Sequence, residues 1–169
     1  EVKEKPKVTS ISIPETMTLT VGESYTFKPV ILEEGATTTL SWNSSNSSVI
    51  SVDKGKIKAI SQGTAVVTCT ATNGVSASCQ VTVNPVLVNS ITLNHSELNI
   101  NKGEKIQLYA SILPENATNK DLKWSSDNEN VAFVGTDGTV IGVSNGYCNI
   151  TATAKDGSDK YAGCIVPVS

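Results

Sequence analysis

Apolar and polar residues alternate along most of this chain. The clearest stretch runs from Ala65 to Ala71, where every second side chain is apolar. Alternation at period two places the apolar side chains of a strand on one face. Turn-forming pairs such as Asn73-Gly74 separate the alternating segments at intervals of about eight to twelve residues. Since no window of helical length has a 3.6-residue period, the pattern predicts an all-β fold of antiparallel sheets with one solvated face each.

The same pattern occurs twice. The segment LSWNSSNSSVISV at 40–52 matches LKWSSDNENVAFV at 122–134, and the other strand segments return in the same order. We therefore expect two domains, 8–84 and 85–169, preceded by a tether at 1–7. About seven strands are predicted for each copy. Those of the first copy are 8–13, 17–21, 25–32, 39–43, 49–52, 56–60 with 64–71, and 77–83.

The second copy carries an ordered set of short motifs. They are V-x-x-I-x-L at 88–93, L-x-I-x-x-G-E at 98–104, I-L-P-E-N-A-T at 112–118, L-x-W-x-S-x-N at 122–128 and G-T-V-x-G-V at 138–143. This set resembles the bacterial Ig-like group 2 family, often called BIG2. The resemblance implies two tandem immunoglobulin-like β-sandwich domains. Proteins with this module are typically bacterial or phage surface proteins, including adhesins, or glycan-active enzymes that carry it as an accessory domain. It implies no chemistry, because a fold does not determine a function.

Charge and hydropathy limit the classes of partner and the cellular compartments that we expect. The net charge is −3 and the pI about 5.1, so neither nucleic acid nor an anionic membrane surface is expected as a partner. No apolar run is long enough to insert into a membrane, which leaves any anchor outside this chain. The opening EVKEKPK is not a signal peptide, and we interpret the chain as a mature or excised fragment. We expect it at the bacterial cell surface or in the extracellular medium.

Four cysteines fall two per copy, on either side of the last hairpin. If Cys69 lies opposite Cys79, their Cα atoms are about 4.5–5.5 Å apart, within reach of a disulfide. The alignment of the copies puts Cys148 and Cys69 at different strand positions, so a shared register allows only one bridge. The Asn73-Gly74 turn favours Cys69–Cys79, whereas Cys148–Cys164 needs a shifted register or a different loop. The alternative is that all four are small buried groups.

Candidate chemistry is sparse. The single histidine, His95, follows a strand and is expected to be a solvated turn residue. The cysteine spacings and the single histidine do not fit a zinc site, so no cofactor is expected. The densest oxygen cluster is Asp127-Asn128-Glu129-Asn130, which we considered for calcium, but the spacing of a calcium loop is missing. We expect no metal site and no catalytic group.

Aromatic residues are few, and the two tryptophans recur at equivalent positions of the two copies. Trp42 and Trp124 occupy the same repeat position on an alternating strand, which favours a place in the core over an exposed sugar platform. Tyr109, Tyr147 and Tyr161 lie outside the core pattern of the second copy. These three are the candidate ligand contacts.

Three functions remain open. The chain is a module for adhesion, display or spacing at the cell exterior, or a carbohydrate-binding module, or an accessory part of a larger glycan-active enzyme. The expected partner is an extracellular protein or a glycan. We favour the first, a non-catalytic extracellular Ig-like module.

Overall fold

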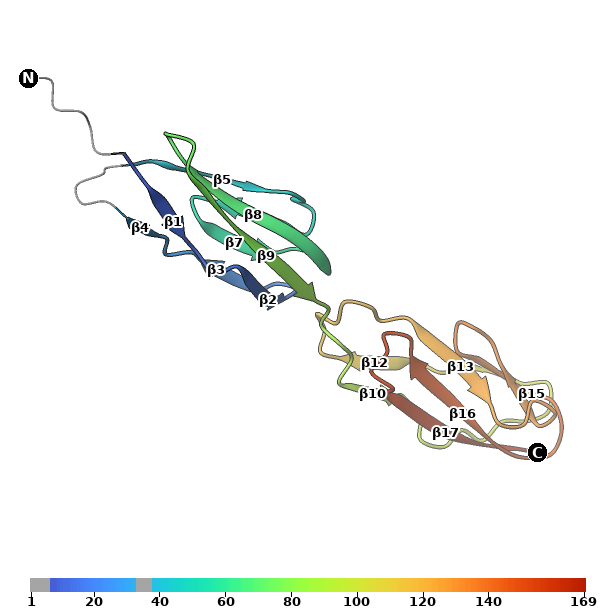
Figure 1. Ribbon diagram of the computed structural model, residues 1–169. Coiled ribbons are helices and arrows are strands. Elements are labelled where there is room, and N and C mark those ends of the chain that lie inside the picture. The colour runs from blue at the N-terminus through green and yellow to red at the C-terminus, as the bar shows by residue number, and fades with distance from the viewer. Residues whose placement is uncertain (1–6, 33–37) are drawn as a thin grey trace, which may run out of the picture. The chain divides into compact units, whose positions relative to one another are not determined.

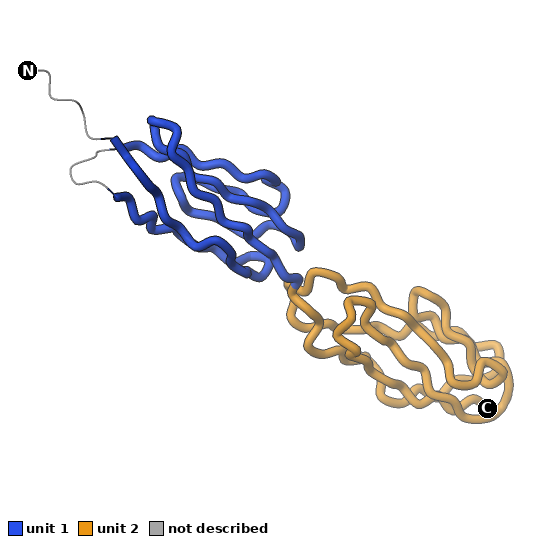
Figure 2. Tube along the Cα trace, in the orientation of Figure 1, with its two compact units in different colours: residues 1–85 blue, residues 86–169 orange. Residues whose placement is uncertain are grey.

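The computed structural model describes residues 7–32 and 38–169 and contains only strands, turns and loops there. The predicted tether at 1–7 lies outside these residues except for Lys7. The chain divides into two compact units, 1–85 and 86–169, called domain 1 and domain 2 below (Figure 2). The predicted all-β class is confirmed (Figure 1). No helix in the described residues could cross a membrane.

Domain 1 has a four-stranded sheet, a three-stranded sheet and a separate strand pair. The four-stranded sheet has the order β2 (Thr16–Thr20), β9 (Ser76–Asn84), β8 (Gly63–Ala71) and β5 (Leu40–Ser44). The three-stranded sheet has the order β3 (Ser24–Thr26), β7 (Lys56–Ala59) and β6 (Ile50–Asp53), and β1 (Ser10–Ser12) pairs with β4 (Val30–Leu32).

Three details of the strand prediction for domain 1 are wrong. The segment 25–32 is two strands, because β3 pairs with β7 whereas β4 pairs with β1. The combined segment 56–60 with 64–71 is also two strands, β7 and β8, which belong to different sheets. The expectation of purely antiparallel sheets fails at β2, which runs parallel to β9 after the chain leaves β1 at Pro14.

Domain 2 repeats this arrangement. Its sheets have the orders β13 (Leu122–Ser126), β16 (Gly146–Ala154), β17 (Tyr161–Val168) and β11 (Lys105–Gln107), β15 (Thr139–Gly142), β14 (Ala132–Val134), and β10 (Ser90–Leu93) pairs with β12 (Ala110–Leu113). In place of β2, Glu97 and Ile100 form parallel bridges to β17. That edge of the sheet is therefore covered, and β13 is left at the other edge.

Each domain buries its own core. The larger cluster of domain 1 includes Ile50, Ile57 and Val67, and that of domain 2 includes Leu108, Ile150 and Val166. Among the described residues, no polar or charged residue is classed as buried. Burial of apolar surface is thus the main force that holds each sandwich together.

The two tryptophans are half-buried and pack against these cores. Trp42 stacks on Phe27 with ring centroids 5.3 Å apart, whereas Trp124 packs against the cluster that contains Leu108. The backbone passes close under each indole, at Gly55 and at Gly138. Both tryptophans therefore contribute to the core, as predicted, and both also remain partly exposed.

Asp156 ties the hairpin turn of domain 2 to the first residues of that domain. Its carboxylate accepts hydrogen bonds from the N–H of Val88 at 2.5 Å and from the N–H of Ser158 at 2.9 Å. Hydrogen bonding, first to the Ser158 side chain and then to Val88, lowers the pKa of Asp156 below its ordinary value. The folded state therefore favours the ionised carboxylate over the protonated one.

We expect Asp156→Asn to lower the melting temperature of domain 2 at neutral pH, because the carboxylate is the better acceptor. A pKa that is lower in the folded state stabilises the fold above the unfolded-state pKa, about 3.9 for aspartate. That stabilisation disappears as the pH falls through the lower folded-state value. Melting curves of both proteins between neutral and strongly acidic pH should therefore converge at the acid end; a constant difference at all pH values would contradict this role.

Candidate functional site

The exposed face of the sheet β13-β16-β17 carries two of the three candidate tyrosines. Tyr147 on β16 is 76% exposed and Tyr161 on β17 is 71% exposed. The register pairs Tyr147 with Pro167 and Tyr161 with Thr153. Tyr147 is therefore six residues, or roughly 20 Å, from the row that contains Tyr161. The tyrosines share a face but do not form one site.

Tyr109 lies away from this sheet. It follows β11, is 66% exposed, and its N–H donates to the side-chain oxygen of Asn94 at 2.8 Å. The structure therefore does not bring the three candidate ligand contacts together. Their shared exposure is compatible with surface recognition, and their separation excludes a single platform of three rings.

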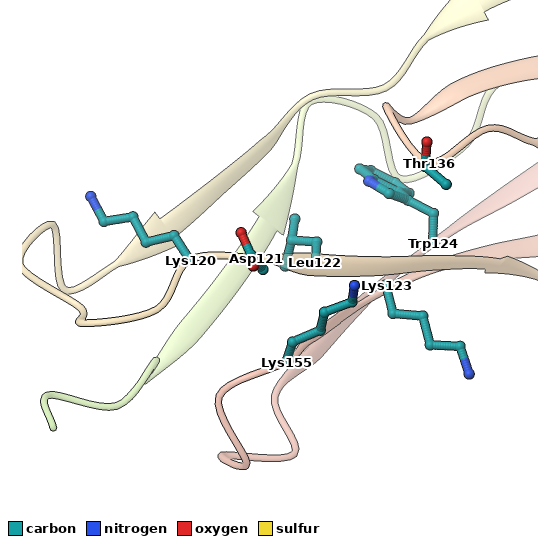
Figure 3. A pocket seen from close by; sticks show the side chains of 7 residues that line it. All are labelled: Lys120, Asp121, Leu122, Lys123, Trp124, Thr136 and Lys155. Atoms are coloured by element: carbon teal, nitrogen blue, oxygen red, sulfur yellow. The ribbon is translucent and has the colours of Figure 1, made fainter.

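A groove of about 540 Å³ runs along the edge strand β13. Its lining is Lys120, Asp121, Leu122, Lys123, Trp124, Thr136 and Lys155. Figure 3 shows the indole of Trp124 beside Thr136, with Leu122 on the same side of the strand. Lys123 extends to the opposite side, and Lys155 approaches from the end of β16. We call this feature the edge groove.

The backbone of β13 contributes polar groups to the edge groove. The N–H of Lys155 donates to the carbonyl of Asp121, and the N–H of Asp127 donates to the carbonyl of Asn149. Bonds to a neighbouring antiparallel strand recur at every second residue, so the odd-numbered residues of β13 face β16. The N–H and C=O groups of Leu122 and Trp124 therefore point outward at the sheet edge.

The first copy lacks the charges of the edge groove. The repeat places Thr38, Ser41 and Thr72 where domain 2 has Lys120, Lys123 and Lys155. The exposed face also differs, since Thr64 and Ser76 replace Tyr147 and Tyr161 at the same register positions. Sequence reasoning missed this groove, although the gain of three lysines between the aligned copies is a signal that could have revealed it.

The four cysteines are free and buried. In the first hairpin Cys69 is opposite Ala77 and Cys79 is opposite Val67. In the second, Cys148 is opposite Val166 and Cys164 is opposite Ile150. The expectation that Cys69 lies opposite Cys79 is wrong, because Ala71 is bonded to Val75, which centres the turn on Asn73 and not on Gly74 as that pairing requires.

The register also separates Cys148 from Cys164 by one diagonal step. Diagonal neighbours in a sheet have Cα atoms about 7–8 Å apart, which is too far for a disulfide without backbone movement. Both predicted bridges are therefore absent from the structure, and the alternative of small buried groups describes all four residues. Burial raises the pKa of all four thiols above the ordinary cysteine value.

We expect the four thiols to be unreactive in the native protein, because both burial and a raised pKa suppress the thiolate. A thiol reagent such as Ellman's should label none of the cysteines at neutral pH and all four after denaturation without reductant. Labelling of only two cysteines in denaturant would reveal a disulfide and would contradict the register described above.

The residues considered for other chemistry are spread over separate turns. His95 is exposed, as expected for a turn residue. Both oxygens of the Asp127 carboxylate accept hydrogen bonds from Asn149, each at 2.7 Å, which lowers the pKa of Asp127. The Asn128 side chain accepts the N–H of Asn130 at 3.2 Å. Among residues 7–32 and 38–169 no group of His, Cys, Asp or Glu is arranged to hold a metal ion.

Comparison with known proteins gives relatives of several kinds. An Ig-like virion protein of Serratia phage KSP90 is 35% identical over 163 residues, which cover 92% of this chain and 63% of the phage protein. An uncharacterized protein of Clostridium acetobutylicum is 30% identical over 155 residues, 89% of this chain and 16% of that protein. The kappa-carrageenase of Pseudoalteromonas carrageenovora is 37% identical over 83 residues, 49% of this chain and 20% of the enzyme. The chain thus spans less than two thirds of the length of these relatives.

Solved structures include the S-layer protein SbsC, which aligns with 98% of this chain and 28% of its own at 20% identity and a TM-score of 0.49. The family model described as bacterial Ig-like domain (group 2) matches residues 7–83 and 87–165, one match in each domain. The predicted tandem immunoglobulin-like β-sandwich fold is thereby confirmed. Because these two matches together cover nearly the whole chain, it belongs to the bacterial Ig-like domain (group 2) family.

Proposed function

We propose that this chain is a non-catalytic extracellular module that displays and spaces binding surface on the outside of a bacterium. The observation that carries the proposal is that the two domains share one core scaffold and differ in their exposed side chains. The two domains have the same strand registers and separate apolar cores, while their exposed faces carry different side chains. A repeated scaffold with a variable surface suits recognition, because surface substitutions away from special features cost little stability.

The connection between the domains is short. Within domain 1 the carbonyl of Asn84 accepts the N–H of Val21 at 3.0 Å, and within domain 2 the N–H of Val86 donates to the hydroxyl of Thr118 at 2.8 Å. Only Pro85 stands between these two held residues, and proline fixes φ. A one-residue connection of this kind supports a spacing role.

Two experiments on the organism that makes the protein test the proposal. Antibodies raised against the purified chain should label intact cells or the culture medium, and external protease should remove the label from cells. Labelling that appears only after lysis would overturn the extracellular assignment. Deletion of both domains from the full-length protein should reduce attachment of the cells to the solid surface or host tissue used in the assay, while the remaining protein is still exported. Unchanged attachment would overturn the adhesion role.

A second role is supported by the relatives. The kappa-carrageenase and an alpha-L-arabinofuranosidase of Bifidobacterium longum match this chain over only 20% and 7% of their own lengths. Such short matches favour an accessory module attached to a larger enzyme. Under this role, the purified chain releases no reducing sugar from a polysaccharide, and its removal from the parent enzyme lowers activity on insoluble substrate more than on soluble substrate. Equal losses on both would contradict it.

A further inference from the structure

The edge groove has an excess of positively charged residues. Three lysines, Lys120, Lys123 and Lys155, are among its lining residues, against the single acidic residue Asp121. The chain as a whole has a net charge of −3. A local excess of positive charge on an acidic protein attracts an anionic group to that place and repels anions elsewhere.

The apolar part of the edge groove suits a sugar ring. Trp124 lines the groove with a half-buried indole, and an aromatic ring offers a flat apolar face to the C–H groups of a sugar. The outward N–H and C=O groups of Leu122 and Trp124 and the hydroxyl of Thr136 can pair with sugar hydroxyls. With about 540 Å³, the groove falls within the range of small-ligand sites.

Tyr161 extends the site across the exposed face. Lys123, Thr153 and Tyr161 form one row across β13, β16 and β17, because Thr153 is the register partner of both others. Neighbouring strands are about 4.8 Å apart, so Lys123 and Tyr161 are separated by roughly 10 Å. That distance matches about two sugar units, so a chain that passes from Trp124 over the strand edge to Lys123, on the other side of β13, meets the Tyr161 ring.

We propose that the edge groove of domain 2 and Tyr161 bind an acidic polysaccharide whose carboxylate or sulfate groups pair with Lys123 and Lys155. The groove is open along the strand edge, which admits a polymer from the side. The lysines are few and accompanied by Trp124 and Tyr161, a composition that fits a polymer with one charge every one or two rings better than the dense charge of nucleic acid. This inference adds a class of ligand to the proposed extracellular role. It rests on that role only for the compartment in which the protein meets the ligand.

The test is a binding titration with the complete 169-residue chain. Polygalacturonate supplies carboxylates, dextran sulfate supplies sulfates, and neutral dextran is the uncharged control. Binding is expected for one or both acidic polymers and not for dextran. It should weaken as the salt concentration rises from about 0.05 M to about 0.5 M, because salt screens exposed charges. Equal binding of dextran would overturn the assignment, and so would a failure of both acidic polymers to bind.

Matched variants separate this site from a general effect of charge. Lys123→Gln combined with Lys155→Gln should lower the affinity about tenfold or more, since two charge-assisted contacts are lost. Lys56→Gln combined with Lys58→Gln removes the same charge from exposed positions on β7 of domain 1 and should leave binding unchanged. An equal loss in both double variants would show that binding is not at the edge groove and would overturn the proposal.

The tyrosines give a second matched pair. Tyr161→Ala should weaken binding, whereas Tyr147→Ala should not, although both rings are exposed on the same face. Duplex DNA and anionic lipid vesicles complete the panel, and tighter binding of either one would overturn the assignment to a polysaccharide. If the chain binds none of these polysaccharides, the expected outcomes of the antibody and deletion experiments do not change. Failure of this inference can therefore be distinguished from failure of the proposed function.

Discussion

Replacing Gly138 with alanine will destabilise domain 2 by about 2–5 kcal/mol. Gly138 has a φ of +86°, a conformation that costs a residue with a Cβ about 1–2 kcal/mol. A Cβ added there would lie 2.7 Å from the carbonyl oxygen of Leu108 and 2.9 Å from Cζ2 of Trp124. The first of these atoms belongs to the backbone, so the clash is relieved only if the strand or the indole moves. Denaturant unfolding of the purified variant measures the loss.

Two other glycines control for the backbone term. Gly157 has a φ of +83° and nothing within 4 Å of an added Cβ, so Gly157→Ala should cost only the conformational part, about 1–2 kcal/mol. Gly55, under Trp42 in domain 1, is the intermediate case: an added Cβ would lie 3.0 Å from the indole, and the three nearest atoms all belong to that side chain. The expected order of destabilisation is Gly157, Gly55, Gly138. If Gly138→Ala were no worse than Gly157→Ala, the close packing of Trp124 on this turn would be refuted.

The repeat allowed the domain architecture to be predicted, since two aligned sets of alternating apolar residues require two separate cores. The exposure of Tyr147 and Tyr161 also followed from the pattern, because both lie outside the apolar alternation. The hairpin register did not follow. A two-residue loop at Asn73-Gly74 would place Ser78 opposite Cys69, and the observed three-residue loop places Ala77 there. The predicted pairing of Cys69 with Cys79 needs a hairpin centred on Gly74, so the disulfide prediction failed because it assumed the wrong centre of the turn.

The candidate site was harder to predict because it is formed at a sheet edge. Lys120, Lys123 and Lys155 lie on two segments that are about thirty residues apart in sequence and adjacent only through the pairing of β13 with β16. Which strand is left at the edge depends on the sheet order, and alternation does not reveal that order. For the same reason, alternation does not reveal that the chain passes from β1, which pairs with β4, to β2 in another sheet, since both strands have one apolar face.

Truncation of one core residue in each domain is the second change expected to lower the stability of a domain strongly. Ile150 is a fully buried side chain of the domain 2 core and lies opposite Cys164. Ile150→Ala should cost about 2–5 kcal/mol, from lost burial and from the cavity left behind. Val67 is its repeat equivalent, also fully buried and opposite Cys79, and Val67→Ala removes one methylene fewer and should cost about 2 kcal/mol. A domain of this size is stable by only about 4–12 kcal/mol.

Each substitution should affect only the domain that contains it, because each core cluster is built from residues of a single domain. Hydrogen exchange reports the strands separately, so Ile150→Ala should speed exchange in β13, β16 and β17 and leave β5, β8 and β9 unchanged, with the reverse result for Val67→Ala. Faster exchange in both domains from either substitution would mean that they unfold as one unit. Independent unfolding would mean that the three lysines and two exposed tyrosines of domain 2 affect the stability of domain 2 alone, since substitutions at distant sites with no shared contacts act separately.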